Sequence, residues 1–434
     1  MAQYIKENVF QRKNNYTVLE KKIQDFEQVG YGKYFRKIQK NRYPCIITKS
    51  LLILLAVYEG FYLEMGRSIP FLLQGLTILL VIFCFLEAPH SISKTFNDPV
   101  FLWWFGFGIY SFLSALLFVG ITNNLLNGIY KYFSFLLVCF CASCVTFETK
   151  KIDWLFASVI LVTILSCYQV MFHGVSWRNS GYTVVTMGIE NNPNNLGLTM
   201  SIGLSVLLYP YKKKKSWLWI ICIIISLFVY TVIIYAGSRS GLLCSLVVVF
   251  FSTIAIFRYV FKNSKHIILS TVVLIICIVS IVYFGLNYFN SIGSHNTGFD
   301  RLQNEFKSDA YNGRGNLYSI GINLFTNNLF TGVGYGNFRN YANGFFSHST
   351  YIELLACSGL CGFVLFEIPF VRMIIKNIRM IGGEKSKGIG YWISMLSLFF
   401  VSGFFGIVYY ELFFMLILYM CLSDSRCSTM ERKE

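Results

Sequence analysis

The sequence predicts an all-α, polytopic membrane protein with about twelve transmembrane helices and one long extracytoplasmic loop between helices 9 and 10. Composition is the first observation: of 434 residues, 55% are hydrophobic and 18% aromatic, while 13% are charged. Soluble domains rarely combine so few charges with so many aromatic residues, and apolar runs of about 18–20 residues are typical of transmembrane helices. The succession of such runs and the placement of lysine and arginine between them are the second and third observations.

The predicted spans divide the chain into five regions. Both ends are polar and basic, so the orientation rule places them in the cytoplasm, with the first tail attracted to anionic lipid. The one long polar insert between apolar segments becomes the extracytoplasmic loop. The regions are the cytoplasmic tail 1–45, helices 1–9 in 46–286, the loop 287–350, helices 10–12 in 351–422 and the cytoplasmic tail 423–434.

Twelve apolar segments account for the span count. Residues 391–422 are too long for one ordinary span, so we expect a short hairpin there, with a tight turn that Gly403 and Gly406 permit. The segments are Ile46–Leu63, Phe71–Leu86, Val100–Gly120, Leu125–Phe147, Ile152–Phe172, Asn195–Tyr209, Trp217–Ala236, Ser240–Phe261, Ile267–Leu286, Tyr351–Ile375, Tyr391–Phe405 and Ile407–Leu422.

The basic residues support this topology. With the N-terminus inside, all but eight of the 37 lysines and arginines lie on the cytoplasmic side, as positive-inside orientation requires. The net charge of +16 therefore reflects membrane-flanking residues, which excludes nucleic acid as a partner. The outer side keeps six arginines although the rule disfavours them there, and this requires a reason. The outer basic residues are Arg67, Lys131, Arg178, Arg239, Arg301, Lys307, Arg314 and Arg339.

Three of these arginines have glycine or serine neighbours. Arg239 lies in AGSRSG between two spans, where it either reaches the lipid headgroups or lines an anion site; the adjacent glycines let backbone or ligand approach closely, which favours the anion site. Arg314 lies in NGRGN, before an amphipathic stretch, and Arg178 lies in SWRNS in the second-longest outer connector. Guanidinium is the preferred partner of phosphate because its planar fork donates two parallel hydrogen bonds. The pattern indicates a phosphate site.

His348 directly precedes a predicted span, in SHSTY. It is either an interfacial polar residue or a base, since histidine titrates near neutral pH and can accept a proton from a hydroxyl. Nearby arginines would lower its pKa by repulsion between like charges and keep it neutral. Glu353, five residues further on, would orient His348 or cap the helix.

No metal or cofactor is expected. The outer carboxylates show no tight ligand spacing, and the 13 cysteines fall in apolar runs or in basic flanks, where they serve as small packing residues. The glycine-rich patch Gly332–Gly336 lacks the strand–loop–helix context of a nucleotide loop and is better explained as a flexible turn that returns the loop to the membrane. The intramembrane acids Glu59, Glu367 and Glu411 form no relay that the sequence reveals.

The motifs together resemble the O-antigen ligase/polymerase superfamily. The resemblance is carried by SRSG at Ser238–Gly241, by Gly313 and Arg314, by NLFTGVGYGNF at Asn328–Phe338 and by HSTYIELLACSG at His348–Gly359. These motifs lie within about 190–370, and the topology fits the whole chain. Ser349 departs from the pattern, because many members have asparagine after the histidine.

The resemblance implies a metal-independent, inverting glycosyltransferase that uses undecaprenyl-diphosphate-linked oligosaccharide on the outer face of the cytoplasmic membrane. Arg239 and Arg314 would bind the diphosphate leaving group and His348 would serve the acceptor hydroxyl, while Arg178, Arg339 and Glu353 are expected to bind substrate. Such an enzyme polymerises repeat units or ligates finished glycan to another acceptor; the composition, which suggests an AT-rich genome, favours a capsule or exopolysaccharide polymerase.

Membrane lipid, a chain-length regulator and a flippase are the other expected partners. Two further classes stay open: a flippase or exporter of lipid-linked sugars, which should carry charges along a path across the bilayer, and a non-enzymatic receptor. The concentration of the motif-bearing basic residues on one face favours the enzyme.

Overall fold

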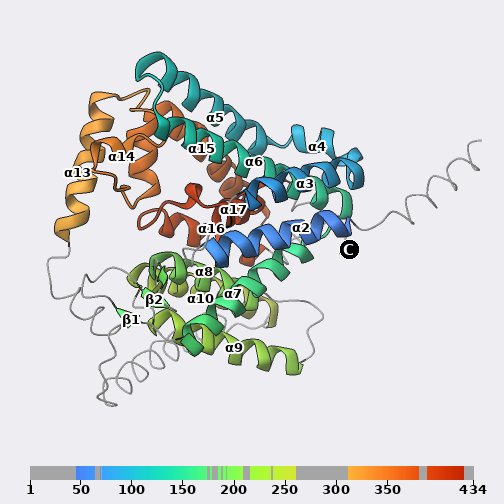
Figure 1. Cartoon of the computed structure of the whole chain (residues 1–434). Helices are drawn as coiled ribbons and strands as arrows, with labels where there is room; N and C mark the ends of the chain where they lie inside the picture. Colours follow the sequence, from blue (N-terminus) through green and yellow to red (C-terminus); the bar gives the residue numbers. More distant parts are fainter. Residues whose placement is uncertain are drawn as a thin grey trace, which may run out of the picture. The chain divides into compact units, whose positions relative to one another are not determined.

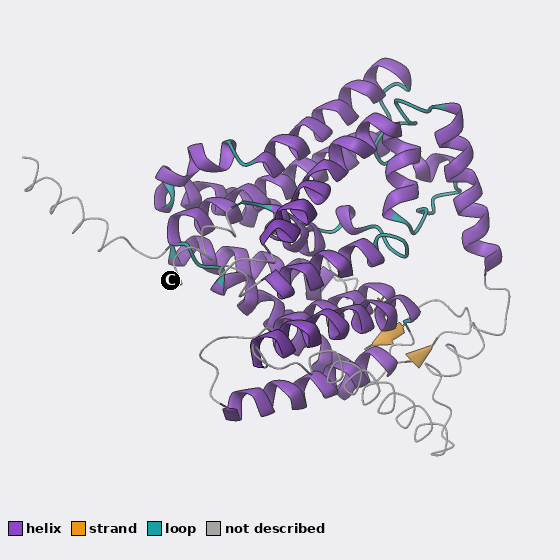
Figure 2. Ribbon diagram, turned by 180° about the vertical axis from the view of Figure 1, so that it is seen from behind, coloured by secondary structure: helices purple, strands orange, loops and turns teal. Residues whose placement is uncertain are grey.

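A computed structural model describes residues 45–63, 69, 71–173, 176–177, 184–186, 189–191, 193–208, 216–235, 238–260, 311–380 and 389–424. The described chain is helical apart from one small sheet (Figure 1, Figure 2). The predicted all-α class is therefore confirmed in its main part. The predicted ninth span, Ile267–Leu286, and the first part of the predicted loop lie outside the described residues.

The first half of the described chain consists of long apolar helices with local caps. The carboxylate of Asp98 accepts the Val100 N–H at 3.0 Å and starts one helix, and the Thr122 hydroxyl accepts the Leu125 N–H at 3.1 Å and starts the next. The elements are α2 (Ile46–Val57), the π-helical η1 (Tyr58–Leu63), α3 (Leu72–Glu87), η2 (Pro89–Ser91), α4 (Ile92–Phe96), α5 (Pro99–Phe118), α6 (Asn123–Thr149) and α7 (Asp153–His173).

Shorter helices dominate the second half. Helix α10 packs against α8 and α16, and α15 packs against α5 and α13. The elements are α8 (Pro193–Leu207), α9 (Ser216–Tyr235), α10 (Arg239–Val260), α13 (Tyr311–Asn327), α14 (Phe338–Tyr341), α15 (Thr350–Met380), α16 (Ile389–Ser402), the 3₁₀ turn η4 (Val408–Tyr410) and α17 (Leu412–Leu422).

After α7 the chain forms a three-stranded antiparallel sheet. This sheet was not predicted from the sequence. It consists of β1 (Ser176–Trp177), β2 (Val184–Thr186) and β3 (Ile189–Asn191), in the order β1-β2-β3. Ser176 pairs with Val185, which in turn pairs with Glu190. Strands of two or three residues are too short to give a periodic pattern of apolar residues. The segment between α7 and α8 therefore carried no strand signal in the sequence.

The described part holds four helices that are long and apolar enough to cross a membrane: α5, α6, Asp153–Val170 and Thr350–Asn377. A fifth candidate is α3 together with Pro89–Phe96, which are bent by 91° relative to each other. The chain is thus a multi-pass membrane protein, while the predicted count of twelve spans is not confirmed. Helices α8, α16 and α17 are shorter than an ordinary span.

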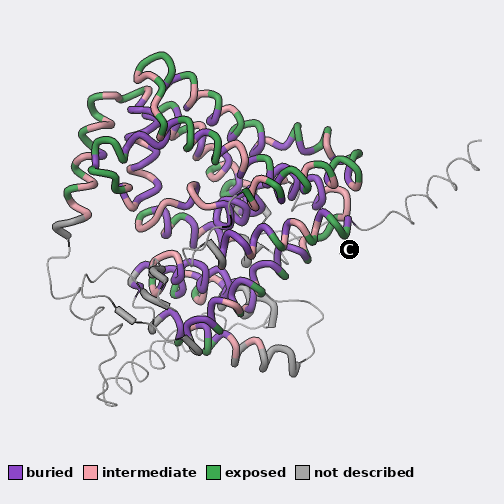
Figure 3. Tube along the Cα trace, viewed as in Figure 1, coloured by how far each residue is buried: buried purple, intermediate pink, exposed green. Residues whose placement is uncertain are grey.

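Exposed apolar side chains cover the outward faces of the long helices. Leu117 and Phe118 at the end of α5 are 72% and 69% exposed, and Figure 3 shows exposed and buried residues alternating along α3 and α5. Lipid is the environment that such faces require. The inner faces pack instead: the Trp104 ring stacks on Phe366 at 5.0 Å and its indole N–H donates to the Phe366 carbonyl, which fixes α5 to α15.

The final apolar stretch forms two helices, α16 and α17, with the chain leaving α16 at the predicted glycines. The carbonyls of Gly403 and Gly406 both accept the Thr350 N–H, at 2.7 and 3.0 Å. The turn between the last two helices therefore holds the start of α15.

The described part of the predicted loop is largely helical. Leu317, Ile320 and Leu324 on α13 pack against a buried cluster that includes Phe338 and Ala356. The amphipathic stretch after Arg314 is confirmed as a helix, and its apolar face attaches the loop to α15 (Figure 1).

Candidate active site

The segment Asn328–Gly336, called here the glycine strap, lies against the middle of α15. The Val333 N–H donates to the Ala356 carbonyl at 2.9 Å. A Cβ atom on Gly332 would lie 2.4 Å from the carbonyl carbon of Cys357, so only glycine allows the two backbones to approach this closely. The sequence predicted a flexible turn here, and the structure shows a turn whose glycines serve close packing.

Helix α15 is broken at Gly359, which has φ 62° and ψ −169°. Two groups at the break hydrogen-bond to the glycine strap: the Leu360 N–H donates to the Leu329 carbonyl at 2.8 Å, and the Cys357 carbonyl accepts from the Gly334 N–H at 2.8 Å. Irregular backbone at membrane depth is tolerated where protein groups satisfy it. The strap supplies the hydrogen bonds that the broken helix lacks.

The break divides α15 into two parts that fold back on each other. We call residues 350–358 the first leg and residues 360–380 the second leg. The rings of Tyr351 and Phe363 are 6.5 Å apart, whereas a continuous helix would separate their backbones by about 18 Å along its axis. The span predicted at 351–375 is therefore helical, as a candidate membrane span should be, but its helix is broken at Gly359.

His348 stands in a tight turn before the first leg, with φ 57°. Glu353 is fully buried, and its Oε2 accepts the Ser347 N–H at 2.8 Å. The Ser347 hydroxyl donates to the Ser349 carbonyl at 2.9 Å, and the Ser349 hydroxyl donates to the carbonyl of Gly403 at 3.1 Å. A histidine with positive φ is strained, and this network holds it there.

Arg314, in the first turn of α13, lies close enough to His348 to act on its charge. Burial lowers the pKa of His348 from its ordinary value, and the positive charge of Arg314 lowers it further. The predicted direction is confirmed, with burial as the larger cause. The structure thus places the half-buried imidazole of His348 within electrostatic range of the Arg314 guanidinium.

Arg339, on α14, is exposed. Its Nε donates to the Gly344 carbonyl at 3.0 Å, and its guanidinium lies 4.8 Å from the centre of the Phe346 ring. Its charge also acts on Glu353. Arg339 is thereby placed near the turn that carries His348, with the rest of its guanidinium free to meet an anion.

The first residue of α10 is Arg239, whose side chain lies outside the described part of the chain. Its neighbours Ser238 and Ser240 both donate to the Asn194 Oδ1, at 3.3 and 2.9 Å. This pairing joins the start of α10 to the start of α8. The close approach that the adjacent glycines were predicted to allow is made at Gly241 by backbone, since a Cβ there would lie 2.6 Å from the Cα of Gly197 in α8.

Sequence reasoning missed the link between α8 and the turn of His348. The Asn195 Nδ2 donates to the Glu411 Oε1 at 2.5 Å. The preceding residue, Tyr410, places its ring 5.1 Å from Phe346 and 5.4 Å from Tyr335 of the glycine strap. The signals in the sequence that could have indicated this link are Asn194 and Asn195 at the start of one apolar run and Glu411 inside another.

These contacts gather the beginnings of four helices. Asn194 and Asn195 begin α8, Arg239 begins α10, Thr350 begins the first leg of α15, and Glu411 directly precedes α17. The N-terminus of a helix carries a partial positive charge and free N–H groups, which favour anions. Together with the arginines, this arrangement suits a phosphate group beside a base.

Two of the predicted site residues are not placed in full. Arg178 lies outside the described residues, and for Arg239 the backbone alone is described. Within the described part, no three His, Cys, Asp or Glu side chains gather as metal ligands. His348, Arg314, Arg339 and Glu353 are brought together.

The fold defines a multi-pass membrane protein, in which the half-buried His348 lies near Arg314 and Arg339. Residues 224–366 match the O-antigen ligase family. The match confirms the resemblance to the O-antigen ligase/polymerase superfamily over the stretch that holds Arg239, Arg314, the glycine strap, His348 and Gly359. No curated protein gave a significant match.

Proposed function

We propose that this protein is a membrane-embedded glycosyltransferase that polymerises undecaprenyl-diphosphate-linked oligosaccharide repeat units into capsular or exopolysaccharide on the outer face of the cytoplasmic membrane. A flippase that delivers the repeat unit and a chain-length regulator are its proposed partners. The observation that carries the proposal is the position of Arg314 beside a half-buried, neutral His348 at the start of a helical leg.

The reaction joins an acceptor hydroxyl to the anomeric carbon of the donor sugar. His348 accepts the hydroxyl proton as the new C–O bond forms, and the bond from the anomeric carbon to the diphosphate breaks with inversion. Undecaprenyl diphosphate leaves with the bonding electrons. Arg314, Arg239 and the helix N-termini stabilise its growing negative charge, and a metal ion is not required for that step.

Helix lengths support a site recessed below the outer membrane boundary. At about 1.5 Å per residue, α8, α16 and α17 measure roughly 22, 21 and 16 Å, less than the 30 Å hydrocarbon core. Lysines and arginines flank the ends of these helices that point away from the site. A site at this depth would meet the diphosphate of a lipid-linked donor near the headgroup level while the isoprenoid chain stays in the bilayer.

Ligation of a finished glycan to another acceptor is the second candidate. The matching family is described by its ligase activity. The chemistry at His348 and Arg314 is the same for both reactions, so the acceptor alone distinguishes them. Purified protein with lipid-linked repeat unit alone should yield a ladder of longer chains if it polymerises, and no product longer than the donor if it only ligates.

The arginine and histidine roles are tested by measuring donor binding and chain extension separately. Arg314→Ala should lower extension by roughly 30- to 1,000-fold, the equivalent of about 2–4 kcal/mol for a charged bidentate contact. Arg314→Lys keeps the charge but loses the fork and should recover extension in part. His348→Ala should slow extension by roughly 10²–10⁴-fold with donor binding largely retained.

Lys131→Ala is the matched control, because it removes an exposed basic residue of the predicted outer set to which no role in the reaction is assigned. Normal extension by Arg314→Ala at normal membrane yield would refute the leaving-group role. Collapse of donor binding in His348→Ala would make this histidine a diphosphate ligand rather than a base.

A further inference from the structure

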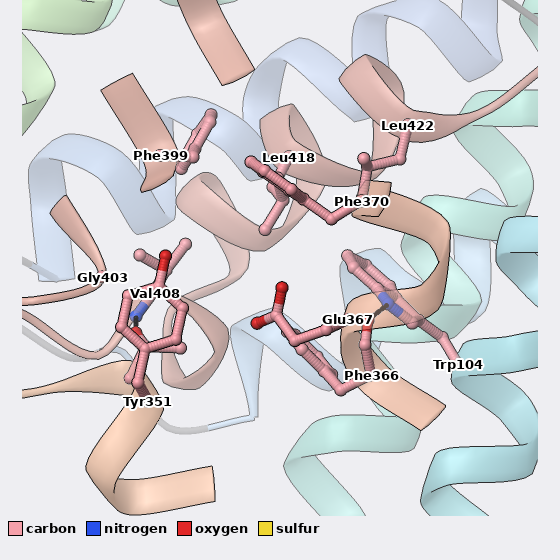
Figure 4. A pocket seen from close by; sticks show the side chains of 11 residues that line it. Trp104, Tyr351, Phe366, Glu367, Phe370, Phe399, Gly403, Val408, Leu418 and Leu422 are labelled. Atoms are coloured by element: carbon pink, nitrogen blue, oxygen red, sulfur yellow. Dashed lines mark hydrogen bonds between the residues drawn. The ribbon is translucent and has the colours of Figure 1, made fainter. Parts of the chain in front are cut away.

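A small cavity lies between the two legs of α15. Its volume is about 20 Å³, enough for one water-sized guest. Walls come from both legs of α15 and from α5, α16 and α17. Figure 4 shows the carboxylate of Glu367 directed toward the space that these side chains enclose.

The polar groups in the cavity wall are engaged elsewhere. The Tyr351 hydroxyl donates to the Phe400 carbonyl at 2.8 Å, and the Thr350 hydroxyl donates to the Gly406 carbonyl at 2.8 Å. Among the residues that the structure describes, none donates a hydrogen bond to Glu367 or forms an ion pair with it.

The remaining wall is aromatic and aliphatic. Trp104, Phe366 and Phe370 contribute rings, and the indole N–H of Trp104 is bound to the Phe366 carbonyl. An unpaired carboxylate in such surroundings is costly, while ring faces attract cations. Glu367 also lies within a candidate membrane span, where an ionisable side chain is a functional candidate by default.

We propose that Glu367 binds one small monovalent cation, a proton or an alkali ion, in this cavity. Either occupant removes the uncompensated charge. In the described chain, no charged group faces Glu367 from α5, α16 or α17, and Tyr351 is its titratable neighbour. The cavity therefore depends on an external positive charge for neutrality.

Occupancy would act on the turn that carries His348. Thr350 and Tyr351 form part of the cavity wall and also the first turn of the first leg, directly after His348 and Ser349. A neutral cavity favours packing of the two legs against each other, and an empty, charged cavity favours entry of water between them. The cation binding itself does not depend on the proposed glycosyl transfer.

The test is thermal unfolding of the full-length protein in detergent. At a pH well above neutral, Na⁺ or K⁺ is compared with choline at equal ionic strength, since choline is too large for the cavity. In a second series, pH is lowered with choline as the sole cation. We expect the small ion or the added protons to raise the Tm of the wild type by about 2 °C or more.

Glu367→Gln keeps the shape of the side chain but cannot hold a charge, so it should lose the response while its Tm in choline equals or exceeds that of the wild type. Glu148→Gln is the matched control, because Glu148 accepts a hydrogen bond from Ser91 and should keep the response. A response to Na⁺ identifies an alkali ion, and a response to acid alone identifies a proton. Equal behaviour of wild type and Glu367→Gln in both series would overturn the proposal.

Discussion

His348 adopts a left-handed backbone conformation that is uncommon for residues other than glycine, although histidine takes it more often than most. Glu353 and the flanking serines hold it there through backbone hydrogen bonds. The carboxylate predicted to orient the histidine thus acts on the backbone of its turn, and the structure shows no hydrogen bond from Glu353 to the imidazole among the described contacts. Strain of this kind is common at sites where a side chain must be aimed.

The proposed role of His348 as the base predicts that its lowered pKa sets the acid side of the pH–rate profile. Its neutral form is the base, so activity should persist below the ordinary histidine value of about 6.5 and fall only when the imidazole gains a proton. Arg314→Ala removes one cause of the shift and leaves burial, so the acid limb of its residual activity should move to higher pH. Arg314→Lys keeps the positive charge, so the acid limb of its pH–rate profile should lie at the same pH as that of the wild type.

The measurement is chain extension as a function of pH at saturating donor. An acid limb that stays in place in Arg314→Ala would show that Arg314 does not act on the catalytic base. A limb that moves equally in Arg314→Lys would assign the effect to the shape of the guanidinium instead of its charge.

At the scale of elements, the fold-back of α15 places the site. The first leg brings His348 and Glu353 beneath α13 and α14, while the second leg packs on α5 through Phe366 and Trp104. Neither leg could take its position if α15 ran straight. The glycine strap and Gly359 are therefore as important to the site as the residues that would touch substrate.

Gly359→Ala should disrupt this arrangement. An added Cβ would lie 2.3 Å from the carbonyl carbon of Phe330, at a residue with positive φ. We expect destabilisation of more than about 2 kcal/mol, seen as a lowered Tm and reduced yield in the membrane.

The matched control is Gly75→Ala in α3, where an added Cβ meets nothing within 4 Å. This substitution should be neutral or stabilise by up to about 1 kcal/mol, because alanine favours helix. Similar behaviour of the two variants would contradict the role assigned to the break.

At the scale of the molecule, the site combines chain segments that are far apart in sequence. Asn195 reaches Glu411, and Thr350 is held by Gly403 and Gly406. The orientation of this assembly in the membrane is predicted from the asymmetry of the basic residues.

Cysteine labelling in intact cells tests that orientation. In a cysteine-free background, a cysteine at Asn312 should react with an impermeant thiol reagent and one at Lys213 should not. The background is required because Cys361 is exposed. The reverse labelling pattern would place the site in the cytoplasm and exclude a donor on the outer face.

The sequence by itself determined the class of the protein and selected the residues that we propose carry the chemistry. Long apolar runs identify membrane helices because polar side chains are costly in the hydrocarbon core. Arginines on the outer side can be recognised as unusual because the positive-inside rule disfavours them there. His348, Arg314 and Glu353 could be selected from local patterns, since each lies beside glycines, serines or the start of a span. The packing role of the cysteines was also predictable: among those described, Cys222 and Cys361 alone are not fully buried.

Only the tertiary structure decided how these residues meet. The break at Gly359 has no signal in hydropathy, because glycine is common inside apolar runs and the hydrogen bonds that stabilise the break come from the distant glycine strap. The pairing of Asn195 with Glu411 likewise depends on where helices end, which is set by packing between segments. Local composition determines whether a segment can form a membrane helix. The position of that segment in the fold is determined by the need of buried backbone and polar groups for hydrogen-bond partners.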